Sequence, residues 1–433
     1  MTDVLRSMIR FSWAMSLFGA RQAVEMLSAV GTARSLRQVS TGFDAVSDAA
    51  QDQLGNGLAE TYRAGDRWQQ VMVDAVFGAL DPAVDLSRNL ASKTLLRGSL
   101  AVLRRSAIIL ESAMPGGGVV WRELGNKLEA FESFQYVDQI LGFENLDAAS
   151  LLEQVTAAEG NGPYLRLWLT EGLGFAFTEA AWDDGEPREL LRRPALEELP
   201  AESLIPLHTG MGLALARHLL PELSGDRQAV REALRRFEEL CVHNARDGFA
   251  LASYEALGLV VRQLAPEAVA EVDRVLSRAV EAEAERGAFW HGFGRGLYFV
   301  ATQTLPGSSG RAVAKARREA PAGPPRLNAL SGLAWALTLV NFRQPEILES
   351  FLREQRFAGA EREAVAAGVA SAVVLWRDAA GDESHLEAFR GHRPSGGSAS
   401  LWGETVTAPC TQALADWQSP KSRLAPGEIF YYR

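Results

Sequence analysis

Three residues that are able to transfer protons occupy the same position of a recurring sequence signature. Glu171, Glu255 and His291 each stand immediately before a triplet of a small, a large apolar and a small residue. Arg295 follows His291 by one helical turn and therefore shares its face of a helix. Carboxyl and imidazole groups act as general acids and bases when their pKa values approach the working pH. We predict that these four residues form a catalytic group, and a structural role is the alternative for His291.

Aromatic and cationic side chains continue the same helix faces. Positions three to four residues apart share one face of an α-helix. Following the faces from the triplets gives four residues that we expect to bind a substrate: Phe175, Tyr298, Trp335 and Arg262. If the helices close into a ring, this face lines a lumen, where charged groups are costly unless paired and tend to mark function. If the array is open, the face is a hydrated concave surface, and its polar residues need no special role.

A short acidic segment could hold a metal ion. WDDGE (182–186) contains Asp183, Asp184 and Glu186, and clustered carboxylates can hold Mg²⁺ together with a diphosphate. The spacing departs from the aspartate-rich motifs of isoprenoid cyclases, and the pattern DxDD is absent. A hydrated turn that ends at Pro187 is the simpler interpretation. We expect no cofactor, with Mg²⁺ at this segment as the alternative.

An internal repeat organises these residues. Six triplets, spaced about 40 residues apart, occur within apolar runs that are separated by more polar stretches. The triplets are Gly172–Gly174, Gly210–Gly212, Ala256–Gly258, Gly292–Gly294, Gly332–Ala334 and Gly368–Ala370. Such a spacing with two helices per unit is typical of helical-pair repeats. The small residues of a triplet lie about 200° apart around a helix, so we expect each flank to approach a neighbouring helix closely.

We predict an all-α protein of three parts. Residues 1–115 are expected to form an N-terminal helical domain, which ends at Pro115 and the glycines that follow. Residues 119–380 contain the six copies, and helix pairs of this kind build either an (α/α)6-like toroid or an open superhelix. Residues 381–433 are expected to form an irregular tail packed on the body. The first helix carries an apolar stripe that could join two copies in a homodimer.

The composition disfavours several classes of function. The 433 residues include 54 acidic and 44 basic side chains, and the net charge of −10 opposes general nucleic-acid binding, which depends on neutralising phosphates. Two cysteines exclude a disulfide scaffold. The sequence has no long uncharged apolar stretch and no signal-peptide pattern, so we expect no transmembrane segment and a cytoplasmic location.

At the triplets the chain resembles an uncharacterised bacterial family found in enediyne natural-product gene clusters. The similar segments are HTGMGLALAR (208–217), RDGFALASYEALGL (246–259), HGFGRGLYFV (291–300) and LSGLAWAL (330–337), within about residues 165–375. The resemblance implies a soluble accessory protein of secondary metabolism that holds or transforms a hydrophobic, polyene-like intermediate. It supplies no catalytic residues.

Three hypotheses of function follow. The first is a natural-product biosynthesis protein that binds a hydrophobic polyene- or isoprenoid-like intermediate in the repeat lumen. The second is an isoprenoid cyclase or isomerase that uses acid-initiated or Mg²⁺-diphosphate chemistry. Its acid-initiated form would fold the substrate against Trp335, Phe175 and Tyr298, with Glu255 or Glu171 as the proton donor. The third is a non-enzymatic scaffold for protein partners, which would expose an apolar patch and contain no large enclosed pocket.

Overall fold

The computed structural model describes residues 118–135, 147–158, 160–183, 185–223, 225–278, 282–299, 309–380, 383–418 and 426–433. Their regular structure is helical and no strand occurs among them, so the all-α prediction is confirmed for this part of the chain. The predicted N-terminal domain and its dimer-forming helix lie outside the described residues. None of the helices described is long and apolar enough to cross a membrane.

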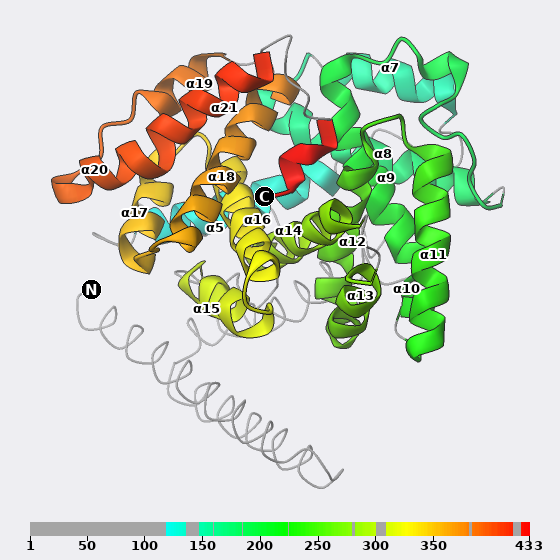
Figure 1. The fold of residues 1–433 in the computed structure, drawn as a ribbon. Helices are drawn as coiled ribbons and strands as arrows, with labels where there is room; N and C mark the ends of the chain where they lie inside the picture. The colour runs from blue at the N-terminus through cyan, green and yellow to red at the C-terminus, as the bar shows by residue number, and fades with distance from the viewer. Residues whose placement is uncertain are drawn as a thin grey trace, which may run out of the picture. The chain divides into compact units, whose positions relative to one another are not determined.

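Each of the six triplets lies within one α-helix. These signature helices are, in chain order, α8 (Pro163–Asp183), α9 (Leu204–His218), α12 (Ala250–Leu264), α14 (Glu283–Phe299), α16 (Pro324–Val340) and α18 (Ala360–Leu375). Each packs against the next one in the chain, as Figure 1 shows for α12, α14, α16 and α18. The π-helical turn η6 (Trp376–Ala380) extends α18 and packs against α8, so the last member of the series contacts the first.

Close approach of the main chains explains the glycines of the triplets. A Cβ atom on Gly292 would lie 1.7 Å from the carbonyl oxygen of Glu255 in the preceding signature helix. On the other flank, a Cβ atom on Gly294 would lie 1.9 Å from the carbonyl oxygen of Ala329 in the next one. Further triplet glycines make the same kind of main-chain contact: Gly174, Gly210, Gly212, Gly258, Gly332 and Gly368. The predicted packing on both flanks is therefore confirmed, and it offsets the cost of about 1 kcal/mol that each helical glycine carries.

Amphipathic helices alternate with the signature helices from α9 onward. They are α11 (Arg227–Asn244), α13 (Val269–Leu276), α15 (Ser309–Glu319) and α17 (Pro345–Gln355), and each buries one apolar stripe. Asp226 caps α11 by accepting hydrogen bonds from the backbone of Gln228 and Ala229. Between α8 and α9 the described residues form only the 3-10 turns η2 (Pro194–Leu196) and η3 (Ala201–Ser203). The first repeat therefore lacks the outer helix of the later ones.

Several shorter or flanking elements complete this part of the chain. The helix α5 (Gly118–Gln135) packs on α8, α16 and α17. The others are α7 (Ala148–Ala158), α10 (Leu220–Leu223) and η4 (Pro266–Ala268).

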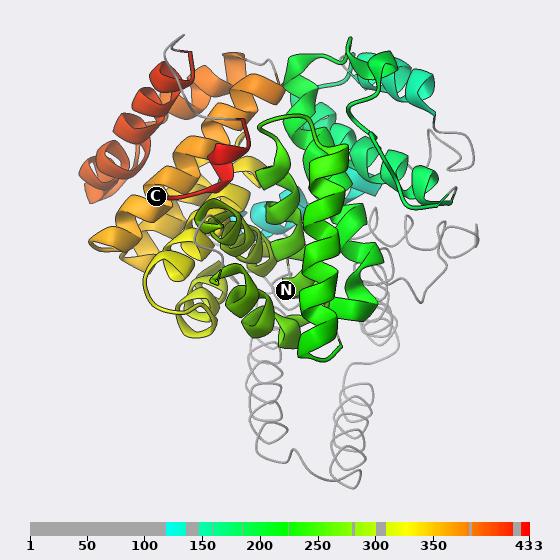
Figure 2. The ribbon, with the colours of Figure 1, turned by 45° about the vertical axis from the view of Figure 1, so that its right-hand side comes forward.

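The C-terminal part is largely helical, so the prediction of an irregular tail after residue 381 is wrong. It contains α19 (Glu383–Arg390), η7 (Gly396–Ser398), α20 (Ala399–Trp402), the π-helical η8 (Gly403–Thr407), α21 (Ala408–Gln418) and η9 (Pro426–Phe430). Val406, Cys410 and Leu414 recur at helical spacing and are buried, which gives this part an apolar stripe. The part packs on the body as expected, with α21 and η8 against α18 (Figure 2).

Candidate functional site

The four predicted acid–base residues meet between α8, α12 and α14. The Arg295 guanidinium donates one hydrogen bond to Glu255 (Nη1 to Oε2, 3.0 Å) and another to Glu171 (Nη2 to Oε1, 2.5 Å). His291 Nδ1 lies 3.8 Å from Glu255 Oε1. All four side chains are buried. We call these four residues the acid–base cluster; the structure brings them together, and their catalytic role stays a prediction.

The helix crossings position this cluster. Glu171, Glu255 and His291 stand directly before the triplets at which their helices touch the next ones. The carbonyl oxygens of Glu171 and Glu255 are the atoms that Gly210 and Gly292 approach. The same contact therefore sets the spacing of the helices and the backbone position from which each carboxylate extends.

Burial and ion pairing determine which carboxyl group holds a proton. Burial raises the pKa of Glu171, and the nearby charge of Glu255 adds to the shift, although Arg295 opposes it. Burial also opposes ionisation of Glu255, but Arg295 and His291 outweigh it and hold the pKa of this carboxyl below its ordinary value. Burial lowers the pKa of His291. The cluster therefore favours an ionised Glu255 and makes Glu171 the carboxyl that more readily carries a proton.

Several polar atoms in and beside the cluster have no hydrogen-bond partner within the described part of the chain. They are Glu255 Oε1, both ring nitrogens of His291, Arg295 Nε and Trp335 Nε1. Buried polar atoms in folded proteins are normally paired, and the exceptions call for an explanation. These unpartnered atoms distinguish the cluster from a buried ion pair in which every polar atom has a hydrogen-bond partner.

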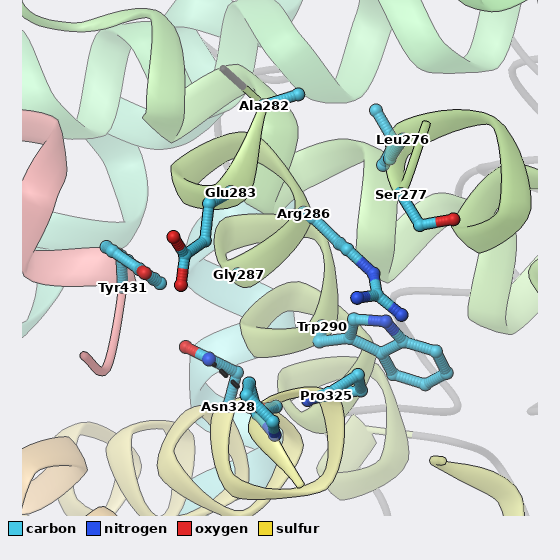
Figure 3. Close-up of a pocket in the computed structure, with 11 residues that line it drawn as sticks. Leu276, Ser277, Ala282, Glu283, Arg286, Gly287, Trp290, Pro325, Asn328 and Tyr431 are labelled. Carbon is cyan, nitrogen blue, oxygen red and sulfur yellow. Dashed lines mark hydrogen bonds between the residues drawn. The ribbon is translucent and has the colours of Figure 1, made fainter. Parts of the chain in front are cut away.

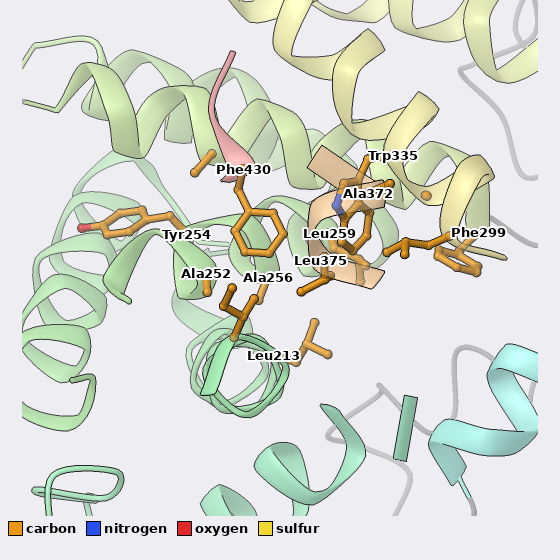
Figure 4. Packing of buried hydrophobic residues seen from close by; sticks show 14 of the residues in the cluster. Leu213, Ala252, Tyr254, Ala256, Leu259, Phe299, Trp335, Ala372, Leu375 and Phe430 are labelled. Carbon is orange, nitrogen blue, oxygen red and sulfur yellow. The ribbon is translucent and has the colours of Figure 1, made fainter. Parts of the chain in front are cut away.

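Aromatic rings fill the space beside the cluster. The Arg295 guanidinium lies 5.2 Å from the Trp335 ring centroid, and the rings of His291, Trp335 and Phe430 meet pairwise, edge to face, with centroids 5.6 Å apart. Phe430 belongs to η9, and Figure 4 shows it with Trp335 among packed apolar side chains. The cavity that remains, with Glu171, Trp335 and Phe430 in its wall, measures about 10 Å³. It has room for about one water molecule.

Tyr298 lies in a second polar network rather than at the cluster. Its hydroxyl accepts a hydrogen bond from Asn341 Nδ2 (2.9 Å), and Lys127 Nζ lies 3.8 Å from its ring centroid. Lys127 also pairs with Glu123 of its own helix, α5 (3.3 Å). This network joins α5 to the ends of α14 and α16, so Tyr298 has a structural explanation.

Phe175 and Arg262 also lie away from the cluster, contrary to the expectation of one continuous inward face. The Phe175 ring packs against Phe134 of α5 (5.9 Å between centroids), and Arg262 pairs with Glu319 of α15 (3.0 Å). The helices approach one another most closely at the triplets, and positions farther along can face other elements. Of the predicted binding residues, Trp335 is the one beside the cluster.

Of the three predicted Mg²⁺ ligands, only the side chain of Glu186 can be described. Glu186 is exposed, and its Oε1 accepts a hydrogen bond from Arg236 Nε (2.8 Å). Asp184 and the side chain of Asp183 lie outside the described residues. Among those described, no group of three or more His, Cys, Asp or Glu side chains could hold a metal ion. A role for Mg²⁺ therefore stays a prediction.

His208 is a buried histidine whose role the sequence pattern did not indicate. Its Nδ1 donates a hydrogen bond to the carbonyl oxygen of Leu204 (2.6 Å), and its Nε2 accepts one from the backbone N–H of Arg246 (2.9 Å). Because Nε2 accepts, the ring is neutral and carries its proton on Nδ1. The ring also stacks on Phe249 (4.5 Å between centroids). His208 thus joins α9 to the turn before α12, and no local sequence pattern predicts this contact.

We expect acid to destabilise the protein through His208. Burial lowers its pKa from 6.5 to about 3, so between these values the unfolded chain binds a proton that the folded chain does not. The contribution of His208 to the free energy of unfolding is fully present above pH 6.5 and is lost as the pH falls toward 3. Between pH 7.5 and 5.0 this residue should remove about 2 kcal/mol from the free energy of unfolding.

Urea denaturation at the two pH values measures this loss. His208→Gln should remove the corresponding part of the pH dependence. His218→Gln, at a partly exposed histidine, is the control and should retain it. The same pH dependence in His208→Gln as in the wild type would contradict the prediction.

A larger cleft lies beside the C-terminal residues. It has a volume of about 220 Å³ and is lined by the start of α14, the start of α16 and Tyr431. Figure 3 shows Glu283 near Tyr431 on one side and Arg286 with Trp290 on the other. Arg286 Nε and Trp290 Nε1 each donate a hydrogen bond to Asp273 (2.7 Å). The cleft is smaller than the roughly 300 Å³ at which small-molecule pockets begin, and its mixed charges do not define one class of ligand.

No family model, curated protein or solved structure matches this chain. The resemblance to a family from enediyne clusters therefore stays a prediction based on the sequence segments.

Proposed function

We propose that the protein binds a hydrophobic, polyene- or isoprenoid-like small molecule between its signature helices, in contact with the acid–base cluster, and serves natural-product biosynthesis. The observation that carries this proposal is the cluster itself, in which four ionisable groups are buried beside an aromatic wall. Three of them, Glu255, His291 and Arg295, keep atoms without a hydrogen-bond partner within the described part of the chain. Perturbed ionisable groups in apolar surroundings are a feature of functional sites. The sequence resemblance supports the assignment to secondary metabolism.

In the enzymatic form of this proposal, Glu171 is the proton donor. The π electrons of a substrate double bond take the proton from the Glu171 carboxyl, so that one carbon gains a C–H bond and its neighbour becomes cationic. Arg295, which donates a hydrogen bond to Glu171, stabilises the carboxylate left behind. The face of an aromatic ring such as Trp335 can stabilise the cation. The pKa directions of the two carboxyls favour Glu171 over Glu255 for this role.

We infer that the signature helices form a superhelix whose ends meet, rather than a toroid with parallel inner helices. Tyr164, at the start of α8, donates a hydrogen bond to the carbonyl oxygen of Val340 at the end of α16 (3.2 Å). Asn341, directly after α16, instead bonds Tyr298 near the end of the neighbouring α14. The adjacent helices α14 and α16 thus bring like ends together, whereas α8 and α16 bring opposite ends together. This pattern supports a progressive rotation along the series.

The two alternatives have less support. A scaffold for protein partners would contain no large enclosed pocket, which agrees with the cavity of about 10 Å³. It would also expose apolar surface, whereas Val242 is the one large hydrophobic side chain that is exposed among the described residues. A Mg²⁺-dependent cyclase would need Asp183, Asp184 and Glu186, and Glu186 is engaged by Arg236.

A bound apolar molecule is the expected result when the protein is isolated from its source without detergent. Native mass spectrometry should detect an added mass that organic solvent removes. The neutral polyene all-trans-retinol should bind the emptied protein with a stoichiometry of one and reduce tryptophan fluorescence by energy transfer. Thr209→Phe adds volume at the cavity wall and should abolish binding, whereas Val242→Phe adds the same group to the surface and should not.

Two results would count against the proposal. One is a wild-type protein that carries no added mass and does not bind retinol. The other is equal retinol binding by Thr209→Phe and Val242→Phe, because the probe would then bind away from the cluster.

A further inference from the structure

The C-terminal segment 426–433 places one aromatic ring inside the space assigned to the ligand. Phe430 is 0% exposed, and its ring meets those of His291 and Trp335 edge to face. The neighbouring residues Ile429 and Tyr431 are partly exposed. Phe430 is therefore the side chain with which this segment reaches deepest between the signature helices.

Hydrogen bonds attach the segment through its main chain and through two tyrosine side chains, since Tyr431 also bonds Glu283 and Tyr432 also bonds Glu363. The Gly427 N–H donates to the carbonyl oxygen of Gly248 (3.0 Å). On the other side of Phe430, the Tyr432 N–H donates to Asn328 Oδ1 (2.7 Å), and Asn328 Nδ2 donates to the carbonyl oxygen of Tyr432 (3.1 Å). These contacts join a short segment to helices that are held together by their own main-chain crossings, so the segment can withdraw while those helices keep their packing.

Consecutive residues of this segment border two separate spaces. Phe430 walls the cavity of about 10 Å³ beside the acid–base cluster, and Tyr431 lines the cleft of about 220 Å³ at the start of α14 (Figure 3). The Tyr431 ring rests on Gly287, where a Cβ atom would lie only 2.1 Å from it. Withdrawal of these two residues would enlarge both spaces from the same side.

We propose that Phe430 occupies the place of the ligand's unsaturated end and that the ligand enters through the cleft beside Tyr431 as segment 426–433 withdraws. The inference rests on the proposed function and adds to it the ligand class and the route. The group bound beside the cluster is flat, unsaturated and of phenyl size. The edge-to-face arrangement around Phe430 favours a π system over a saturated chain, because His291 and Trp335 direct ring edges and faces toward it.

Retinol binding by full-length variants tests this proposal. Phe430→Ala should bind retinol at least tenfold more tightly than the wild type, because the ligand no longer competes with the ring. Ile429→Ala, at the adjacent and partly exposed residue, is the matched control and should keep the wild-type affinity. Hydrogen exchange of the wild-type protein tests the same proposal without depending on how a variant folds. When retinol saturates the protein, the amides of Gly427 and Tyr432 should exchange hydrogen at least tenfold faster, while those of α14 stay protected.

The possible outcomes separate the inference from the proposed function. Tighter binding by Phe430→Ala together with faster exchange in the wild type supports the inference. Equal retinol affinity of the wild type and Phe430→Ala, with unchanged amide hydrogen exchange at Gly427 and Tyr432, overturns the inference and leaves the proposed function standing. Absence of retinol binding by both the wild type and Phe430→Ala overturns both.

Discussion

Gly292→Ala is expected to lower the free energy of unfolding by about 3 kcal/mol or more. The added Cβ atom would lie 1.7 Å from the carbonyl oxygen of Glu255. Main-chain atoms of a buried helix cannot move aside as the end of a flexible side chain can, so α12 and α14 must separate or distort. Urea denaturation followed by circular dichroism measures the loss.

Gly403→Ala is the matched control for this substitution. Gly403 also has helical backbone angles (φ −55°, ψ −47°), yet a Cβ atom there would meet nothing within 4 Å. Since alanine favours the helix, this variant should be as stable as the wild type or more stable by up to about 1 kcal/mol. Equal stability of the two alanine variants would mean that close packing is not the reason for the glycine triplets.

Arg295→Met is expected to cost about 3–5 kcal/mol at neutral pH, because it leaves the carboxylates of Glu171 and Glu255 buried without their cation. Without Arg295, burial and mutual repulsion raise the pKa values of both carboxyls in the folded state. The difference from the wild type should therefore be largest at high pH and should shrink as the pH falls and the carboxyls take up protons. Urea denaturation at pH 8 and pH 5 measures both effects.

Two further variants show whether charge causes this loss. Arg235→Met removes an exposed arginine that pairs with Glu232 and Glu239, and it should leave stability unchanged within error. Combining Arg295→Met with Glu171→Gln and Glu255→Gln removes the buried charges together and should recover most of the stability. If the triple variant is as unstable as Arg295→Met, the loss comes from guanidinium packing, such as that on Trp335, and not from unpaired charge.

The signature helices could be predicted because glycine spacing reports main-chain contact directly. Glycine destabilises a helix unless another helix passes close by. The presence of glycine at positions such as 292 and 294 therefore predicts a close neighbouring helix. The helices after residue 381 have no comparable marker. Their apolar residues, among them Val406 and Cys410, recur at helical spacing only over a short stretch that follows the loop-like segment 391–400, so the helical pattern is harder to recognise.

The same distinction applies to the site. Glu171, Glu255 and His291 were predictable as a group because each is tied to a triplet. The positions of Tyr298 and Arg262 depend on how the helices diverge beyond their crossings. Helical periodicity gives no information about this divergence. Phe430 depends on contacts with His291 and Trp335, which lie 139 and 95 positions earlier, and no local pattern encodes such contacts.

The main-chain crossings have a consequence for how proteins of this kind diversify. Helix spacing is set by glycines and carbonyl oxygens, so the side chains before the triplets contribute little to it. Thr209, Ser331 and Ala367 occupy such positions in the remaining repeats. Substitutions at these positions should therefore leave the helix framework intact. Distant relatives should be sought by the spacing of their glycine triplets rather than by the residues that precede them.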